Sequence, residues 1–164
     1  MSSMDHAKTL AQLLLARGWK LALAESCTGG LVCATLTELS GSSEWFERGY
    51  ITYSNQSKTE CLGVPTGLIE SHGAVSEPVV RAMAQGAQRN AGANVGVSIT
   101  GVAGPTGGTA EKPVGTVCFG WTIPNTAGEN VTASQTKLFS GDRQAIRQQA
   151  TEYVLAGLVQ LLNN

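Results

Sequence analysis

Ser26 is a residue that could carry out chemistry, because it lies where a short apolar strand is predicted to pass into a helix. It belongs to the segment Ala24-Glu25-Ser26-Cys27-Thr28-Gly29-Gly30. Free amide groups and the positive end of the helix dipole favour a bound anion or a developing oxyanion at such a junction. Ser26 is therefore a candidate nucleophile. The alternative is that Ser26 or Thr28 only caps the helix, with the two glycines giving the backbone room to turn.

A second group of candidates lies in Tyr53-Ser54-Asn55-Gln56-Ser57-Lys58, with the phenol at a strand end and the amine in the helix that follows. A serine hydroxyl is a weak nucleophile until a base takes its proton, and a buried lysine or a tyrosine can do so. Lys58 and Tyr53 are both candidate bases, and the sequence leaves the choice open. The alternative for Lys58 is a solvent-exposed helix lysine. The positions of His6 and His72, in the N-terminal region and in a polar loop, argue against a Ser-His-Asp triad.

A glycine-rich loop, Gly101-Val102-Ala103-Gly104-Pro105-Thr106-Gly107-Gly108, follows an apolar strand that ends at Thr100. Loops of this composition cradle phosphates through their backbone amides. The loop matches neither a Walker motif nor the glycine spacing of a dinucleotide-binding fold. Lys112 at its far end and Arg143 at the start of the last helix are candidate cations for a phosphate.

The composition excludes several classes of function. The 164 residues predict a single domain over 1–164, and 42% hydrophobic content suffices for a buried core. A net charge of −1 with only 14% charged residues argues against a nucleic-acid-binding surface. No apolar run reaches the length of a membrane span, so we expect no membrane partner and a cytoplasmic protein. The expected ligand is a small molecule.

The four cysteines Cys27, Cys33, Cys61 and Cys118 form no C-x-x-C pair, which fits neither a disulfide framework nor a zinc site. We expect no metal and mostly reduced thiols. Cys27 is the exception, because a helix N-terminus can lower the pKa of a thiol. A thiol enzyme that uses Cys27 is therefore an alternative to serine chemistry.

The elements that must position these residues alternate between helices and strands. Apolar periodicity predicts helices over 5–17, from Ser26 to about 39, over 55–62, from Ser76 to Gly92 and from about 140 to the C-terminal end, with a further short turn over 66–71. Strands are predicted over 20–24, 49–53, 95–99, 114–123 and 130–139. This order predicts an α/β fold with three α/β/α layers, a mixed, mostly parallel sheet and a late antiparallel hairpin. Ligands bind beyond strand ends in such sheets, here after Ala24, Tyr53, Ile99 and Phe139.

Six ordered motifs give the chain a specific resemblance to a known family. They are Ala24-Glu25-Ser26-Cys27-Thr28-Gly29-Gly30, Tyr53-Ser54-Asn55-x-x-Lys58, Gly73-Ala74-Val75-Ser76, Thr100-Gly101-Val102-Ala103-Gly104-Pro105-x-Gly107-Gly108, Glu111-Lys112-Pro113-Val114-Gly115-Thr116-Val117 and Gly141-Asp142-Arg143. Together they resemble the CinA C-terminal domain family, whose stand-alone members are nicotinamide-nucleotide amidases. The resemblance implies an α/β/α fold, a homodimer, no cofactor or metal, and hydrolysis of nicotinamide mononucleotide to nicotinic acid mononucleotide and ammonia.

The resulting hypothesis assigns a role to each site residue. Ser26 attacks the carboxamide carbon, Lys58 with Tyr53 moves the proton, and backbone amides after Ser26 stabilise the oxyanion. The expected substrate-binding residues are Glu25, Cys27, Thr28, Gly29, Gly30, Thr100, Gly101, Gly104, Gly107, Gly108, Lys112 and Arg143. Thr106 stands where the family usually has Asp, which removes a carboxylate from the glycine-rich loop. A non-catalytic nucleotide-binding or regulatory paralogue is therefore the alternative function.

Overall fold

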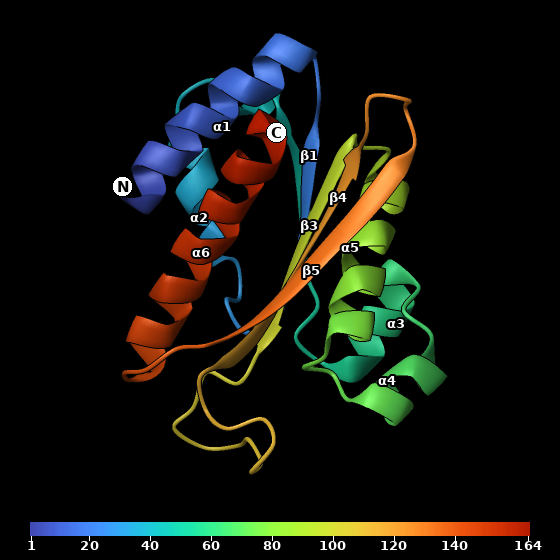
Figure 1. Cartoon of the computed structure of the whole chain (residues 1–164), viewed down its shortest axis with the longest axis vertical. Helices are drawn as coiled ribbons and strands as arrows, with labels where there is room; N and C mark the ends of the chain where they lie inside the picture. The colour runs from blue at the N-terminus through green and yellow to red at the C-terminus, as the bar shows by residue number, and fades with distance from the viewer.

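A computed structural model describes residues 1–164 and contains one five-stranded sheet with helices on both faces. The elements in chain order are α1 (Ser3–Arg17), β1 (Leu21–Glu25), α2 (Leu31–Thr37), the 3-10 helix η1 (Ser42–Glu44), β2 (Phe46–Ile51), α3 (Asn55–Leu62), α4 (Thr66–His72), α5 (Glu77–Ala91), β3 (Val95–Gly101), β4 (Thr116–Pro124), β5 (Asn130–Leu138) and α6 (Arg143–Asn163). Helices α1, α2 and α6 cover one face of the sheet, and α3, α4 and α5 cover the other (Figure 1). The predicted three-layer α/β/α fold is confirmed.

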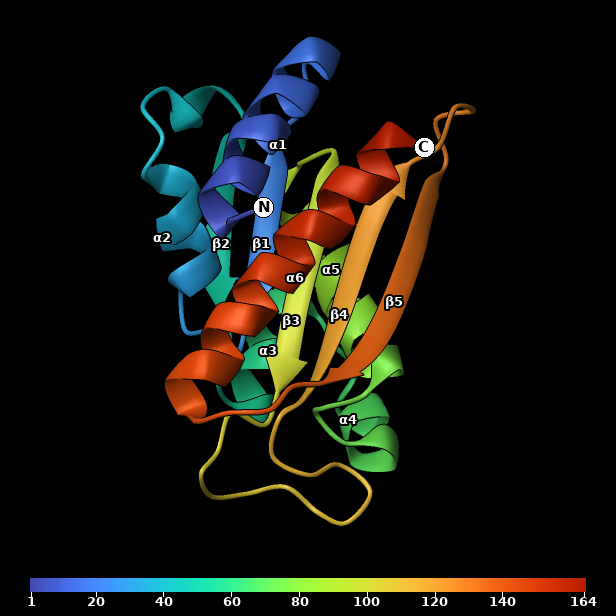
Figure 2. The ribbon, with the colours of Figure 1, turned by 60° about the vertical axis from the view of Figure 1, so that its left-hand side comes forward.

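The strand order is β2-β1-β3-β4-β5. β1 pairs in parallel with both β2 and β3, whereas β3 with β4 and β4 with β5 are antiparallel pairs. The predicted mixed sheet with a late hairpin is therefore confirmed, with its pairings divided equally between the two types. Because β1, β2 and β3 run in one direction, the loops that follow them meet at one end of the sheet. In Figure 2 this is the lower end, where the long yellow loop after β3 projects.

Local sequence signals fix where the helices begin and end. Gly18, Gly63 and Gly92 end α1, α3 and α5 in the left-handed conformation that glycine adopts without steric cost. Ser76 begins α5 by accepting a hydrogen bond from the Val79 amide, and Asp142 begins α6 in the same way through the Ala145 amide. Of these helices, α3 carries Lys58 and α6 carries Arg143.

Two apolar clusters hold the sheet between the helices. The larger cluster of 22 buried residues fills the space beneath α1, α2 and α6, and a smaller cluster of 8 lies beneath α3, α4 and α5. All five residues of β1 are buried, because this strand is central and covered on both faces. The strand therefore carries the carboxylate of Glu25 into the core, directly before Ser26.

Two predicted boundaries near the site are wrong. Helix α2 begins at Leu31 with Gly30 as its N-cap, so neither Ser26 nor Thr28 caps it. Residues 26–30 form a turn instead, in which the Gly29 amide donates to the Ser26 carbonyl at 3.0 Å. Strand β2 covers Phe46–Ile51 rather than 49–53, because Ser54 caps α3 and turns the chain away from the sheet. Tyr53 consequently lies in a loop.

Candidate active site

Lys58 and Ser26 lie in hydrogen-bond contact at the end of the sheet where the parallel strands finish. The Lys58 Nζ donates to the Ser26 Oγ at 3.1 Å. Ser26 follows β1 directly, and Lys58 reaches it from α3. Only 1% of Lys58 and 7% of Ser26 is exposed to solvent. The alternative of a solvent-exposed helix lysine is therefore wrong.

Burial shifts the Lys58 amine toward its neutral form. Burial lowers the pKa of Lys58 from its ordinary value, because the charged ammonium loses its hydration. No carboxylate lies within ion-pair distance, since the one salt bridge of the protein joins Arg48 and Glu47. Nζ also donates to the carbonyls of Thr52 at 3.0 Å and Tyr53 at 3.3 Å. When the amine is neutral and its two hydrogens go to these carbonyls, the contact with Ser26 is reversed, and the Ser26 hydroxyl donates to the lone pair of Nζ.

The Tyr53 side chain lies apart from this pair. Its hydroxyl accepts a hydrogen bond from Arg143 Nη2 at 2.9 Å, and the residue is 59% exposed. No hydrogen bond joins the Tyr53 hydroxyl to Ser26 or Lys58, and only its backbone carbonyl contacts the lysine. Of the two candidate bases, Lys58 alone is within proton-transfer distance of Ser26.

Glu25 was expected to bind substrate, but its carboxylate is fully buried and points into the N-terminus of α2. Oε1 accepts hydrogen bonds from the Gly30 amide at 3.0 Å and the Val32 amide at 3.2 Å, and Oε2 accepts one from the Cys33 amide at 2.9 Å. The Thr28 hydroxyl donates to Oε1 at 2.5 Å. The first amides of α2 are therefore occupied by Glu25, and the side chains of Glu25 and Thr28 contact each other rather than a ligand.

The amides available to an oxyanion are those of Cys27 and Thr28, because neither donates to another residue. They follow Ser26 directly in the chain, and backbone amides can stabilise a tetrahedral intermediate. The Cys27 side chain is 4% exposed, and burial raises the pKa of its thiol to about 12. The thiol is therefore protonated at neutral pH, which disfavours the alternative of a thiol enzyme. A Cβ on Gly101 would lie 3.1 Å from this sulfur, so the turn and the glycine-rich loop pack directly together.

The glycine-rich loop is linked to both helical layers. Gly104, Gly107 and Gly108 have positive φ angles of 76°, 87° and 80°, which shape the loop as only glycines do readily. Arg143 Nη1 donates to the Gly104 carbonyl at 2.9 Å, and Lys112 Nζ donates to the His72 carbonyl at 2.7 Å. Both predicted cations therefore border the loop, Arg143 from α6 and Lys112 toward α4.

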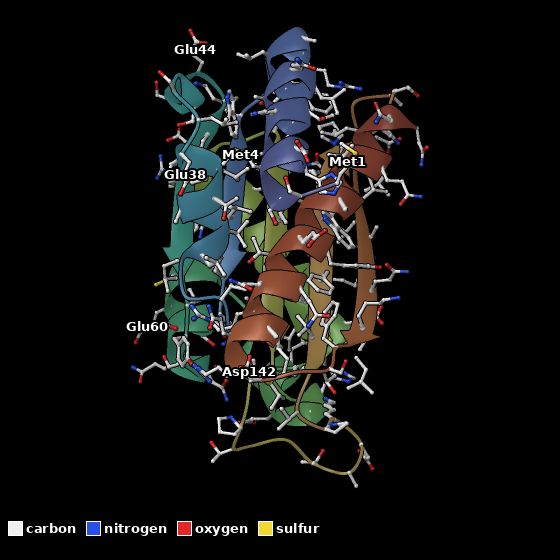
Figure 3. The ribbon with its side chains drawn as sticks, turned by 90° about the vertical axis from the view of Figure 1, so that its left-hand side faces the viewer. Met1, Met4, Glu38, Glu44, Glu60 and Asp142 are labelled. Atoms are coloured by element: carbon white, nitrogen blue, oxygen red, sulfur yellow. The ribbon has the colours of Figure 1, made fainter.

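The remaining predicted site residues, Thr100, Gly29 and Gly30, lie at different places around the site. Thr100 is 1% exposed and donates its hydroxyl to the Ala74 carbonyl at 3.0 Å. Gly29 and Gly30 adopt positive φ angles of 58° and 108° within the turn. A cavity of about 440 Å³ lies beside the glycine-rich loop, lined by Ala103, Pro105, Val114, Gly141, Asp142, Arg143 and Gln144. Figure 3 shows Asp142, one of these lining residues, at the lower end of α6.

Arg147 belongs to the site, although the sequence analysis did not single it out. Its Nε donates to the Cys27 carbonyl at 3.1 Å and its Nη2 to the Thr28 carbonyl at 2.8 Å. The signal was present in the sequence, because residues four apart share one face of a helix and Arg143 had already been chosen on α6. The turn after Ser26 is thus held by a side chain more than a hundred residues away.

The larger cavities of the molecule lie elsewhere. Two hollows of about 620 and 910 Å³ share Trp19, Pro124, Asn125 and Thr126 near the β4–β5 turn, at the opposite end of the sheet. Neither Ser26 nor Lys58 lines either hollow.

No three His, Cys, Asp or Glu side chains are grouped so as to hold a metal ion. No helix combines the length and apolar character needed to cross a membrane.

The chain is similar to known proteins over nearly its whole length. The CinA C-terminal domain family matches residues 3–162. The nicotinamide-nucleotide amidohydrolase PncC of Escherichia coli (strain K12) is 50% identical over 157 residues, which cover 96% of this chain and 93% of the relative. The protein of the same name from Enterobacter agglomerans is 54% identical over 142 residues, covering 87% and 84%. The crystal structure of a competence or damage-inducible protein from Enterobacter asburiae matches 99% of both chains, with a TM-score of 0.92 and 37% identity.

Proposed function

The chain belongs to the CinA C-terminal domain family, and from this membership and the geometry of the site we propose that it is a nicotinamide-nucleotide amidohydrolase with Ser26 as its nucleophile. The observation that carries the proposal is the contact of 3.1 Å between the Lys58 amine and the Ser26 hydroxyl. A buried lysine of lowered pKa beside a serine provides the base that an otherwise unreactive hydroxyl needs. The names of relatives that are about half identical support the substrate class.

In the proposed reaction, Ser26 Oγ attacks the carboxamide carbon of nicotinamide mononucleotide while Lys58 Nζ takes the hydroxyl proton. The carbonyl oxygen becomes an oxyanion that accepts hydrogen bonds from the Cys27 and Thr28 amides. Lys58 then gives its proton to the departing nitrogen, which leaves as ammonia, and an ester to Ser26 remains. Water attacks this ester with Lys58 again as base, releasing nicotinic acid mononucleotide and the free serine.

The nucleotide phosphate would be bound beside the glycine-rich loop. Arg143 borders both the Gly104 carbonyl and the Tyr53 hydroxyl, and a guanidinium can contact a phosphate with two parallel hydrogen bonds. Lys112 adds a second cation across the loop. Thr100 and the amides of Gly104, Gly107 and Gly108 complete the proposed binding site. We propose a homodimer as the working assembly.

The alternative function is a nucleotide-binding or regulatory protein without catalysis. It is favoured by Thr106, which is exposed in the glycine-rich loop where the family usually carries an aspartate. In that protein the loop and Arg143 would hold a nucleotide, while the Ser26–Lys58 pair would leave the amide intact.

The test is ammonia release from nicotinamide mononucleotide by the wild type, Ser26→Ala and a control, Ser71→Ala, which alters an exposed serine on α4. We expect ammonia from the wild type and the control, and none from Ser26→Ala with its fold and nucleotide binding retained. Turnover by Ser26→Ala would contradict serine catalysis. Nucleotide binding by the wild type without ammonia release would favour the regulatory alternative.

A further inference from the structure

We propose that Arg147 is a positioning residue that holds the Thr28 amide in the direction from which it donates to the developing oxyanion. The inference rests on the proposed function in one respect, namely that Ser26 is the attacking group. Arg147 itself need not touch the substrate. It acts on the peptide bonds of the turn that follows the nucleophile.

In a peptide bond the carbonyl and the amide lie in one plane and point in opposite directions. The Thr28 amide shares its peptide bond with the Cys27 carbonyl, which accepts a hydrogen bond from Arg147 Nε at 3.1 Å. Fixing this carbonyl toward α6 points the Thr28 amide away from α6. The second contact, from Nη2 to the Thr28 carbonyl at 2.8 Å, restrains the next peptide bond together with the Leu31 amide, which donates to the same carbonyl at 3.0 Å.

The other free amide is oriented without any distant residue. The Cys27 amide shares its peptide bond with the Ser26 carbonyl, which accepts the Gly29 amide at 3.0 Å within the turn. The two donors therefore differ in how they are held. The direction of the Cys27 amide is set by the turn, whereas that of the Thr28 amide depends on a side chain from α6.

Arg147 and Glu25 hold the turn through different groups. Glu25 binds the Thr28 hydroxyl and the amides at the start of α2, and Arg147 binds the carbonyls of Cys27 and Thr28. Arg147 is half-buried and forms no ion pair, and these two carbonyls are the only hydrogen-bond partners of its side chain within the protein. The guanidinium of Arg147 therefore makes its hydrogen bonds within the protein to the turn alone.

The test measures the reactivity of Ser26 directly, with a fluorophosphonate in place of the nucleotide. In this reaction Ser26 Oγ bonds to phosphorus, the P–F bond breaks, fluoride leaves and Lys58 takes the hydroxyl proton, while the phosphoryl oxygen requires the same amide donors. The variants are Arg147→Met, which removes the fork, and Arg147→Lys, which keeps the charge. The matched control is Arg17→Met, because Arg17 also donates to a distant backbone carbonyl, that of Leu162, but far from Ser26.

We expect the second-order rate of Ser26 labelling to fall by about 10²-fold in Arg147→Met, the loss that follows removal of one oxyanion donor. Arg147→Lys should fall between this value and the wild type, because a single ammonium lacks the planar fork. Arg17→Met should label at the wild-type rate. With nicotinamide mononucleotide, Arg147→Met should lower kcat and leave KM nearly unchanged, whereas loss of a phosphate contact would raise KM.

The outcomes separate the inference from the proposed substrate. Slow labelling in the Arg147 variants supports the inference even if the wild type releases no ammonia from nicotinamide mononucleotide, and only the substrate is then wrong. Wild-type labelling rates in both Arg147 variants would overturn it. A wild type that is not labelled at Ser26 would overturn the inference together with serine catalysis. If Arg147→Met melts below the assay temperature, Arg147→Lys decides: a rate below the wild type supports the inference, and an equal rate overturns it.

Discussion

Glu25 and Thr28 form a buried hydrogen bond of 2.5 Å that joins the last residue of β1 to the turn that begins at Ser26. The same carboxylate accepts three amides from the start of α2. A fully buried carboxylate is tolerated here because these donors and the positive end of the helix dipole replace its hydration. The strand, the turn and the helix are thereby fixed to one another around Ser26.

Glu25→Gln should destabilise the protein by about 1–3 kcal/mol, because one of the two oxygens becomes an amide that faces the backbone donors of α2. Amidase turnover should also fall, since the turn that contains Ser26 loses its anchor. Chemical denaturation of the purified variant measures the first effect. Glu44→Gln, an exposed glutamate in η1, is the control and should change stability by no more than about 0.5 kcal/mol. Equal stability of the two variants would contradict this role of Glu25.

The fold was largely predictable because its signals are local. The glycines that end α1, α3 and α5 and the alternation of strands with helices identified the layers and the late hairpin. The start of α2 was wrong because the deciding contact, a glutamate side chain binding amides five to eight residues later, has no periodic signature. Strand β2 was misaligned because it is an edge strand whose end is set by the cap of the next helix.

The site could be predicted only in part. Spacing and residue type were enough to choose Ser26, Lys58, the glycine-rich loop and Arg143. The sequence could not show which base reaches the serine, because that depends on how α3 packs beside β1, and this contact joins residues 32 positions apart. Nor could it show that Arg147 reaches the turn, across 120 residues, or that Glu25 faces inward.

Cys27→Ala should retain most of the amidase turnover, because burial raises the pKa of this thiol to about 12 and leaves it unreactive at neutral pH. Its cost should be a loss of stability of about 1 kcal/mol, similar to the loss of one buried methyl group. Iodoacetamide should modify the exposed Cys61 well before Cys27 in the folded wild type. Loss of turnover in Cys27→Ala with an unchanged melting curve would instead favour thiol catalysis.

Lys58→Met should lower turnover by roughly 10²–10⁴-fold, the usual contribution of a general acid or base. Methionine keeps much of the length and apolar volume of the lysine stem but lacks the amine that contacts Ser26. Nucleotide affinity, measured by calorimetry with the product, should remain close to that of the wild type, since Arg143 and the glycine-rich loop are untouched. Lys137→Met, on the exposed strand β5, is the matched control. Wild-type turnover in Lys58→Met would exclude the lysine as base.

The pH dependence of turnover should follow the same amine. Burial lowers the pKa of Lys58 from its ordinary value of 10.5, so the neutral base forms at a lower pH than it would in water. We expect kcat to rise with pH through an apparent pKa below 10.5 and to fall in acid, where the ammonium holds no lone pair. A kcat profile recorded across this range checks the prediction. A profile that decreases as pH rises through the same range would contradict a lysine base.

The lowered pKa of Lys58 also predicts how stability changes with pH. Between this lowered pKa and the ordinary value of 10.5, the unfolded lysine binds a proton that the folded lysine has lost. The free energy of unfolding contributed by Lys58 therefore rises with pH across this window, and below it the penalty of burying the ammonium is fully present.

Lys58→Met lacks this penalty at every pH. The melting temperature of the variant relative to the wild type should accordingly be highest on the acid side of the window and decline as pH approaches 10.5. Thermal melts of both proteins at several pH values measure this difference, and Lys137→Met should run parallel to the wild type. A difference in melting temperature that stays constant or grows with pH would show that folding does not lower the pKa of Lys58.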